Sequence, residues 1–313
     1  MVKIIMALLF IWPLTSLSQV KTFDEMVGYK NLPEVDSGKI WVVDSRADKK
    51  NLGVVQVGAY NKKFPVLNDA PLDSIMQKLI GSKIQDELTG KSILLNIRLF
   101  NFAETTKSMK EYGYVRFRAE LYQTFPEYFT ELGTIDTLIT ISFIDVTNKM
   151  MKESFKVIEN WVRTSMNIAP DTTKKISLTT IKKRDEIEKK EMPLYRGKPL
   201  INGIYQTYEE LVNVEPGITK VEISYNAESK KMLAKMPESN QIKFLTSKQG
   251  YAVAYNNALF ILTPEGVSQA YPKDGFIHFK AKYNRDYSKE IDNTLITYKI
   301  DHLNGAWLPV SER

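Results

Sequence analysis

Residues 92–102 read SILLNIRLFNF, residues 115–121 read VRFRAEL and residues 135–143 read IDTLITISF; these runs decide the fold of the 313-residue chain. In each run apolar residues alternate with polar ones, as in a strand that buries only one of its faces. Apolar residues at helical spacing flank the runs on both sides, after Pro71 and after Thr147. This order predicts an α+β layer, with an antiparallel or mixed sheet covered by two helices on one face.

The polar positions of these strands lie on the sheet face opposite the apolar ones. They include Asn96, Arg98, Arg116, Arg118 and Glu120, which carry both charges but no histidine or cysteine. We interpret this face as solvated scaffold. Loops more often carry binding residues than strands do, so we expect any functional surface of this part in the connections 104–113 and 126–133.

The first eighteen residues have the pattern of a signal peptide. Lys3 provides a positive start, residues 4–14 are an apolar run too short to span a bilayer, and small residues precede a predicted cleavage after Ser18. The chain contains no cysteine, so it forms no disulfide and has no cysteine for lipid attachment. We therefore expect a periplasmic or secreted protein with no transmembrane span after cleavage.

Composition divides the rest of the chain into three segments, at residues 19–170, 171–193 and 194–313. The middle segment is rich in lysine and glutamate, and we expect a charged, partly helical linker there. Residues 171–198 carry nine basic and five acidic groups, which accounts for most of the net charge of +6. Because the flanking parts are nearly neutral, a nucleic-acid site on a folded basic surface is not expected.

The last segment has short β-type runs separated by turn residues and predicts a small, mostly antiparallel β domain. Asn256 and Asn257 separate two of these runs, and asparagine tolerates the positive φ of a tight hairpin turn. We expect strands at 218–225, 250–255, 259–263, 275–283 and 294–300.

Patterns of known catalytic, metal or cofactor chemistry do not occur in the sequence. His278 and His302 are the only histidines; we place His278 on the solvated side of a strand and His302 near a turn. We accordingly assign no catalytic residue, no metal ligand and no cofactor. Carboxylate pairs such as Asp44/Asp48 and Glu209/Glu210 leave a secreted, glycan-directed hydrolase as the alternative function.

Two resemblances add an expectation about compartment and role. The helix after Pro71, the strands with Asn96 and Arg98, and residues 113–122 and 141–147 resemble the auxiliary lipoproteins of ABC-type envelope transporters and the related curli-secretion lipoproteins. Those families begin with a lipidated cysteine, which this chain lacks. Residues 202–211 (NGIYQTYEEL) and 250–261 resemble a module of uncharacterised exported proteins of Bacteroidota. The first resemblance implies an accessory role and the second agrees with export.

From these observations we expect a non-catalytic cell-envelope protein that binds a protein, lipid or glycan partner or helps to assemble one. Its oligomeric state and its partner stay open. Aromatic side chains concentrate binding energy at interfaces, so the candidate partner contacts are Tyr128, Phe129, Tyr205 and Tyr251.

Overall fold

The structure is a computed structural model that describes residues 22–36, 38–57, 62–107, 110–143, 146–229, 231–235, 241–282 and 295–310. The predicted signal peptide, 1–18, and its cleavage site lie outside these residues. Over the described ranges, no helix combines the length and the apolar character that crossing a membrane requires.

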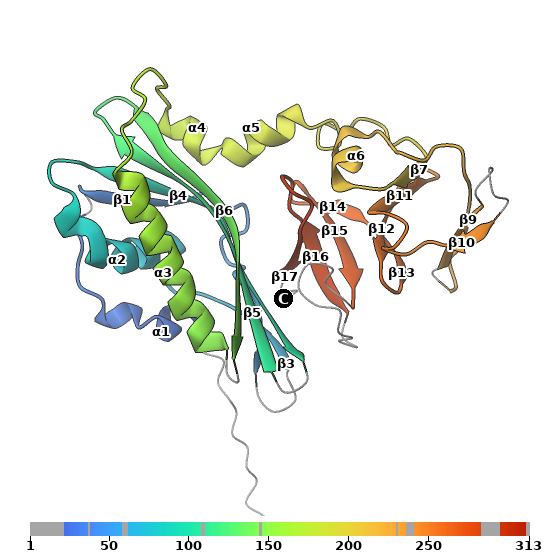
Figure 1. Ribbon diagram of the computed structural model, residues 1–313, viewed down its shortest axis with the longest axis horizontal. Helices are drawn as coiled ribbons and strands as arrows, with labels where there is room; N and C mark the ends of the chain where they lie inside the picture. The colour runs from blue at the N-terminus through green and yellow to red at the C-terminus, as the bar shows by residue number, and fades with distance from the viewer. Residues whose placement is uncertain are drawn as a thin grey trace, which may run out of the picture.

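A mixed sheet forms the N-terminal part (Figure 1). Its centre is three long antiparallel strands, β4 (Ile93–Lys107), β5 (Lys110–Thr124) and β6 (Phe129–Phe143). On the other edge of β4, two strands run parallel to it, β1 (Ile40–Asp44) and β2 (Gly53–Val57), and β3 (Lys62–Pro65) pairs with β2. The mixed sheet and its α+β class confirm the prediction.

The prediction that residues 104–113 form a polar connection between strands is wrong. The antiparallel register of β4 and β5 continues to the pair Lys107 and Lys110, so most of this stretch is strand. Likewise β6 already begins at Phe129, within the expected connection 126–133. Polar side chains at alternate positions do not end a strand when the backbone ladder supplies the hydrogen bonds.

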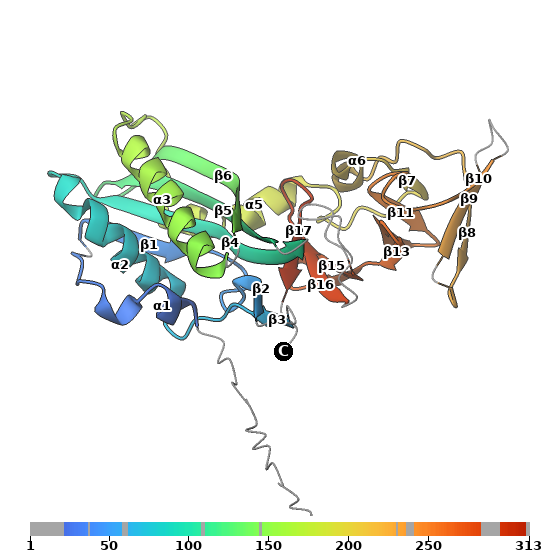
Figure 2. The same ribbon diagram turned by 60° about the horizontal axis from the view of Figure 1, so that its bottom comes forward.

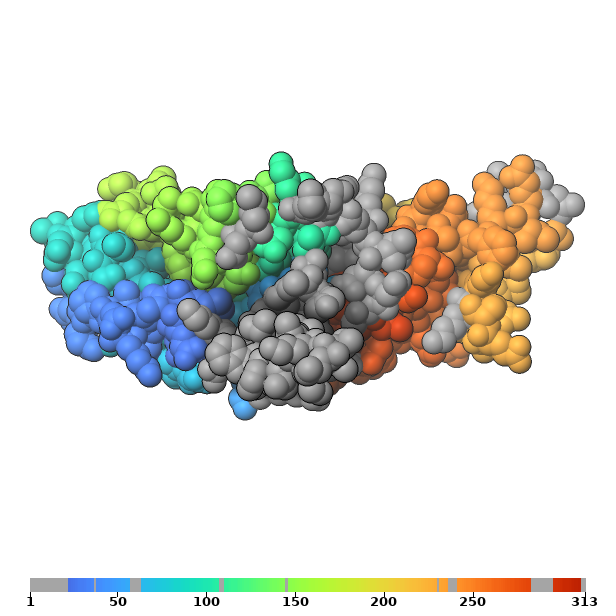
Figure 3. Space-filling view, turned by 90° about the horizontal axis from the view of Figure 1, so that it is seen from below, coloured from blue at the N-terminus to red at the C-terminus, as the bar shows by residue number. Residues whose placement is uncertain are grey.

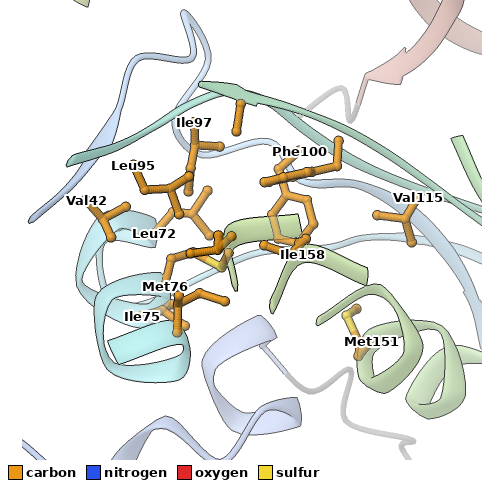
Figure 4. Packing of buried hydrophobic residues seen from close by; sticks show 14 of the residues in the cluster. Val42, Leu72, Ile75, Met76, Leu95, Ile97, Phe100, Val115, Met151 and Ile158 are labelled. Carbon is orange, nitrogen blue, oxygen red and sulfur yellow. The ribbon is translucent and has the colours of Figure 1, made fainter. Parts of the chain in front are cut away.

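Two helices cover one face of the sheet, α2 (Leu72–Ile84) and α3 (Thr147–Met166), as predicted. Pro71 directly precedes α2 with an extended backbone, and Asp73 and Lys83 complement the dipole at its two ends. Figure 4 shows Ile75 and Met76 of α2 and Met151 and Ile158 of α3 pointing towards the sheet residues Leu95, Ile97 and Phe100. The short helix α1 (Phe23–Met26) adds Phe23 to this core, and the 3-10 turns η1 (Tyr29–Asn31) and η2 (Gln85–Glu87) flank α2.

The segment 171–193 crosses the opposite face of the sheet. It contains α4 (Leu178–Lys182) and α5 (Arg184–Glu191), so it is partly helical as expected. Ser177 begins α4 by accepting a hydrogen bond from the backbone N–H of Thr180. Ile181 packs against Val43, Leu94 and Tyr122 of the sheet, which fixes α4 on it.

Three small antiparallel sheets form the C-terminal part. One has the order β13-β12-β11-β7, the second β14-β15-β16-β17 and the third β10-β9-β8. Asn256 and Asn257 make the predicted tight turn between β11 and β12, with φ of +48° and +61°. The elements are β7 (Gly203–Tyr205), α6 (Tyr208–Asn213), β8 (Glu222–Asn226), β9 (Lys231–Lys235), β10 (Ile242–Phe244), β11 (Ala252–Tyr255), β12 (Ala258–Thr263), β13 (Gly266–Gln269), β14 (Tyr271–Lys273), β15 (Phe276–Ala281), β16 (Ile296–Ile300) and β17 (Trp307–Val310).

The two parts lie side by side along the long axis of the molecule, with β8–β10 at the far end (Figure 3). Figure 2 shows β17 at the junction, next to β2 and β4. There the Asn101 amide of β4 donates a hydrogen bond to the Pro309 carbonyl of β17, at 3.3 Å. The C-terminal sheet is thereby in contact with the polar side of the N-terminal sheet.

Candidate functional site

The polar face of β4 and β5 is buried, which corrects its interpretation as solvated scaffold. Asn96, Arg98, Arg118 and Glu120 are at most 5% exposed, and Arg116 is half-buried. Helix α5 contacts Arg98, and the residues between β16 and β17 contact Arg118, both from segments far along the chain. Charged side chains are almost never fully buried unless they are paired, so their partners define the site.

We call the charged groups that meet here the junction cluster. They come from β4, β5, β6, α5 and the end of β16 with its turn, and all of them except the exposed Asp136 are buried or partly buried. The cluster consists of Arg98, Arg118, Glu120, Asp136, Asp185, Glu188, Asp301 and His302.

Arg98 holds three carboxylates from three elements. Its guanidinium lies 2.8 Å from Glu120 of β5 and 2.6 Å from Asp185 of α5, and it also contacts Glu188 one helical turn further. Burial alone would lower the pKa of Arg98, but the three carboxylates together outweigh it and raise that pKa above its ordinary value. Arg98 therefore remains charged and ties α5 to the sheet.

Glu120 is the most deeply buried carboxylate that Arg98 holds, at 1% exposure. Besides the ion pair, its other oxygen accepts hydrogen bonds from the Tyr122 hydroxyl at 2.7 Å and the Asn96 amide at 3.1 Å. Asn96 also donates to the carbonyl of Ile181 in α4. A buried charge is tolerated when its lone pairs are satisfied in this way.

Arg118 makes the equivalent link to the C-terminal part. Its two terminal nitrogens lie 3.1 Å and 2.7 Å from the two oxygens of Asp301, and one of them is 2.8 Å from Asp136 of β6. Burial alone would raise the pKa of Asp301, but the charge and hydrogen bonds of Arg118 and the N–H of Leu303 lower it. This bidentate pair fixes the orientation of the β16–β17 turn.

His302 joins the two halves of the junction cluster. Its Nε2 lies 3.1 Å from Glu188, its carbonyl accepts a hydrogen bond from the Tyr208 hydroxyl at 2.8 Å, and it is 2% exposed. Burial would raise the pKa of Glu188, but the His302 hydrogen bond and Arg98 together lower it. Glu188 is thus held as a carboxylate at neutral pH.

Arg98 and the small volume of the adjoining cavity limit which ligands the junction cluster can bind. Ligand atoms of Asp185, Glu188 and His302 lie within 4.8 Å of one another, a grouping that can hold a metal ion. However, the Arg98 guanidinium already pairs with both carboxylates. The adjoining cavity, between Arg46, Lys299 and the cluster, measures about 20 Å³, which is room for about one water molecule. Among the residues that the structure describes, Asp185 and Glu188 are thus paired, and the adjoining space is too small for a substrate.

A second cavity, of about 720 Å³, lies on the other side of Phe276. Helix α5, the segment 194–200 and residues of β12, β14 and β15 line it. Most of its lining side chains are apolar, and its charged members are Glu186, Lys189, Lys190 and Lys198. Its size lies in the range of small-molecule sites.

Two of the predicted partner contacts are corrected by burial. Tyr205 is 0% and Tyr251 is 4% exposed, and both belong to the C-terminal core. Their hydroxyls are used inside the fold: Tyr205 donates to the Ile201 carbonyl and Tyr251 to the Gly305 carbonyl. Large apolar area draws an aromatic residue into a core as readily as into an interface.

The other two predicted contacts, Tyr128 and Phe129, are half-buried, so a role in partner contact stays a prediction. Tyr128 stacks on Phe125, with ring centroids 4.7 Å apart. Phe129 pairs through its backbone with Ile176 of the linker.

The expected solvated position of His278 is wrong, because the side chain is 5% exposed and stacks with the Tyr271 ring. In each of the carboxylate pairs that suggested a hydrolase, one member is engaged in another contact. Asp44 pairs with Arg46 at 2.9 Å, and Glu210 accepts backbone N–H bonds from Gln206 and Gly217.

The sequence pattern identified one side of the junction cluster and missed the other. Alternation placed Arg98, Arg118 and Glu120 on one face, but Asp185, Glu188 and Asp301 looked like ordinary surface charges. A helical spacing of three residues between Asp185 and Glu188 was the available signal, since it places both on one face of α5.

Comparisons of the chain with protein-family models, with curated proteins and with solved structures find no match. The likeness to transport auxiliary and curli-secretion lipoproteins and to the Bacteroidota module therefore stays a prediction.

Proposed function

We propose that this chain is an exported, non-catalytic binding or assembly protein of the cell envelope, with a protein, lipid or glycan as its partner. The observation that carries the proposal is the self-contained charge pairing of the junction cluster. Arg98 and Arg118 hold the carboxylates that face them and join α5 and the C-terminal part to the N-terminal sheet. Such an arrangement supports a scaffold that presents its surfaces and cavities in a fixed relation.

A carboxylate hydrolase needs two acidic side chains that converge on a substrate, one of them able to carry a proton. Here the converging pair, Asp185 and Glu188, contacts an arginine, and the pKa of Glu188 is lowered rather than raised. The neighbouring cavity admits about one water molecule. These features favour binding over hydrolysis.

Export is tested with a reporter. Residues 1–30 are fused to alkaline phosphatase, an enzyme that needs disulfides and is active only where they form. We expect activity from the fusion and none after deletion of residues 4–14. An inactive full fusion, made in normal amounts, would show that the proposed compartment is wrong.

Absence of catalysis is tested with residues 19–313 and a panel of polysaccharides, chromogenic glycosides, esters and peptides. We expect no turnover above buffer. Turnover that disappears in Glu188→Gln and persists in Glu153→Gln, a surface carboxylate of α3, would replace this proposal with the hydrolase hypothesis.

A further inference from the structure

The 720 Å³ cavity beside α5 has an apolar interior. Its walls include Leu194, Leu200, Leu259, Ala270, Phe276 and Ile277, contributed by the segment after α5 and by β12 and β15 with the residue before β14. Figure 1 shows how this segment leads from α5 to the region of β7 and α6. An apolar cavity of this volume accommodates a small molecule that buries hydrocarbon.

One charged group in the wall, the Lys189 ammonium, forms no ion pair with any residue that the structure describes. The Lys189 ammonium donates to the Gly275 carbonyl at 2.9 Å and lies 3.3 Å from the centre of the Phe276 ring. Among the described residues, no carboxylate lies within 4 Å of it, although Asp185 and Glu188 on the same helix pair with Arg98. Burial lowers the pKa of Lys189 to about 8. A partly buried ammonium of this kind gains from an anion that enters the cavity.

The other charges around the cavity favour the same sign of ligand. Lys190 and Lys198 line it together with Lys189, against the single carboxylate of Glu186. The Lys299 side-chain nitrogen also lies nearby, 5.0 Å from the centre of the Phe276 ring. The electrostatic field therefore attracts an anionic group, while the walls favour a ligand whose remaining part is apolar.

We propose that this cavity binds a single-chain anionic amphiphile, with its hydrocarbon chain along the apolar walls and its head group paired with Lys189. This inference rests on the proposed binding function and names its ligand class. A glycan fits less well, because its hydroxyls need polar partners along the whole site and most of the lining side chains here are apolar. The head group is a carboxylate or a phosphate monoester, and both give charge-assisted hydrogen bonds to an ammonium.

The test uses residues 19–313 and calorimetric titration below micelle-forming concentrations. Palmitoleate and hexadecyl phosphate are the two anionic probes, and palmitoleyl alcohol is the uncharged probe with the same chain as palmitoleate. We expect one saturable site per chain and affinity at least about tenfold higher for an anionic probe than for the alcohol, as one charge-assisted bond provides. The tighter of the two anions identifies the head group.

Two variants locate the site. Lys189→Met keeps an unbranched side chain only one atom shorter and removes its charge, so it should reduce the affinity for the anionic probe to that for the alcohol. Lys182→Met, an exposed lysine of α4 outside the cavity, is the matched control and should change neither. Ala270→Trp fills the cavity and should weaken the binding of the anionic probes and of the alcohol. Thermal unfolding checks that each variant is folded.

Equal affinities for anion and alcohol in the unchanged chain, or an unchanged preference in folded Lys189→Met, would overturn the ligand class. Binding that persists in folded Ala270→Trp would overturn the location. Neither result affects the proposed non-catalytic function, which fails only by turnover in the substrate panel or by an inactive export fusion.

Discussion

Arg98 is the side chain on which the buried carboxylates of the junction depend most. Arg98→Ala would leave Glu120, Asp185 and Glu188 close together and without their shared counter-charge. Removing one partner of a buried ion pair costs about 3–5 kcal/mol, because the remaining charges stay desolvated. We therefore expect a fall of this size in the free energy of unfolding, measured by urea denaturation.

The control for Arg98→Ala is Lys156→Ala, which removes an ion pair with Glu153 on the exposed side of α3. Solvent screens that pair, so the urea midpoint should stay where it is. Equal effects of the two substitutions would contradict the structural role of Arg98.

For single residues, the sequence indicates on which face of the sheet a side chain lies, but not which segment covers that face. Alternation in residues 92–102 correctly separated Ile97 from Arg98, since that period follows from strand geometry. What covers Arg98 depends on Asp185 and Glu188, almost ninety residues later. No local pattern encodes such a contact, because a solvated arginine and a buried, paired one occur in the same alternating sequence.

Helix α5 and the β16–β17 turn depend on carboxylates whose pKa values are lowered in the fold. Glu188 and Asp301 have folded-state pKa values below their unfolded values. Their contribution to the free energy of unfolding is therefore complete above the unfolded-state pKa values, roughly 4.3 for Glu and 3.9 for Asp. It is lost as the pH falls through the folded-state pKa values. We expect the thermal midpoint to fall steeply below about pH 4.

Glu188→Gln tests this assignment, because glutamine keeps the shape of the side chain and does not titrate in this range. The variant should be less stable at pH 7 and should lose less stability than the unchanged chain between pH 7 and pH 3. A pH dependence identical in both would show that Glu188 does not contribute.

The β16–β17 turn also depends on a close approach to α6. Gly305 has φ of +72°, and a Cβ there would lie 2.3 Å from Cγ of Tyr208. Gly90 has a similar φ of +69° and no atom within 4 Å of an added Cβ, so it is the matched control. Gly90→Ala should cost about 1–2 kcal/mol from the left-handed backbone alone.

Gly305→Ala should cost about 1–3 kcal/mol more than Gly90→Ala, because overlap with Tyr208 adds to the backbone strain. Urea denaturation of the two variants gives the difference. Equal losses would mean that Tyr208 moves aside without cost, and that the turn is not packed tightly on α6.

Long elements were predictable and short ones were not. Helices α2 and α3 and strands β4 to β6 repeat their apolar pattern often enough to fix both type and face. Strands β3, β10 and β14 have three or four residues and include lysine or proline. Their pairing partners, rather than their own side chains, make them strands, so propensity alone did not find them.

The whole molecule consists of two parts with separate apolar cores, joined by charged contacts. The N-terminal core lies between the sheet and α2 and α3, and the C-terminal cores lie among β7 to β17. Composition separates a charged segment at 171–193, but no local pattern indicates that this segment is itself part of the contact. If the parts separate, Arg118 loses Asp301, and Arg98 loses Asp185 and Glu188 where α5 leaves the sheet, so unfolding of one part exposes buried charge in the other.

We therefore expect the two parts to unfold together in the unchanged chain. Trp307 is fully buried in the C-terminal part, and the long helices belong to the N-terminal part. In residues 19–313 with Trp41→Phe and Trp161→Phe, Trp307 is the one tryptophan that remains. Its fluorescence reports on the C-terminal part, and far-UV circular dichroism reports mainly on the N-terminal part. Coincident urea transitions by the two probes are the expected result.

Adding Arg98→Ala and Arg118→Ala to that reporter chain should separate the transitions, since each part then unfolds without exposing a paired charge in the other. Adding Lys156→Ala instead should leave them coincident, because its ion pair lies on α3, away from the junction. Separate transitions in the reporter chain itself would show that the junction cluster does not couple the two parts. Coincident transitions in the double-arginine variant would assign the coupling to other contacts, such as that of Asn101 with the Pro309 carbonyl.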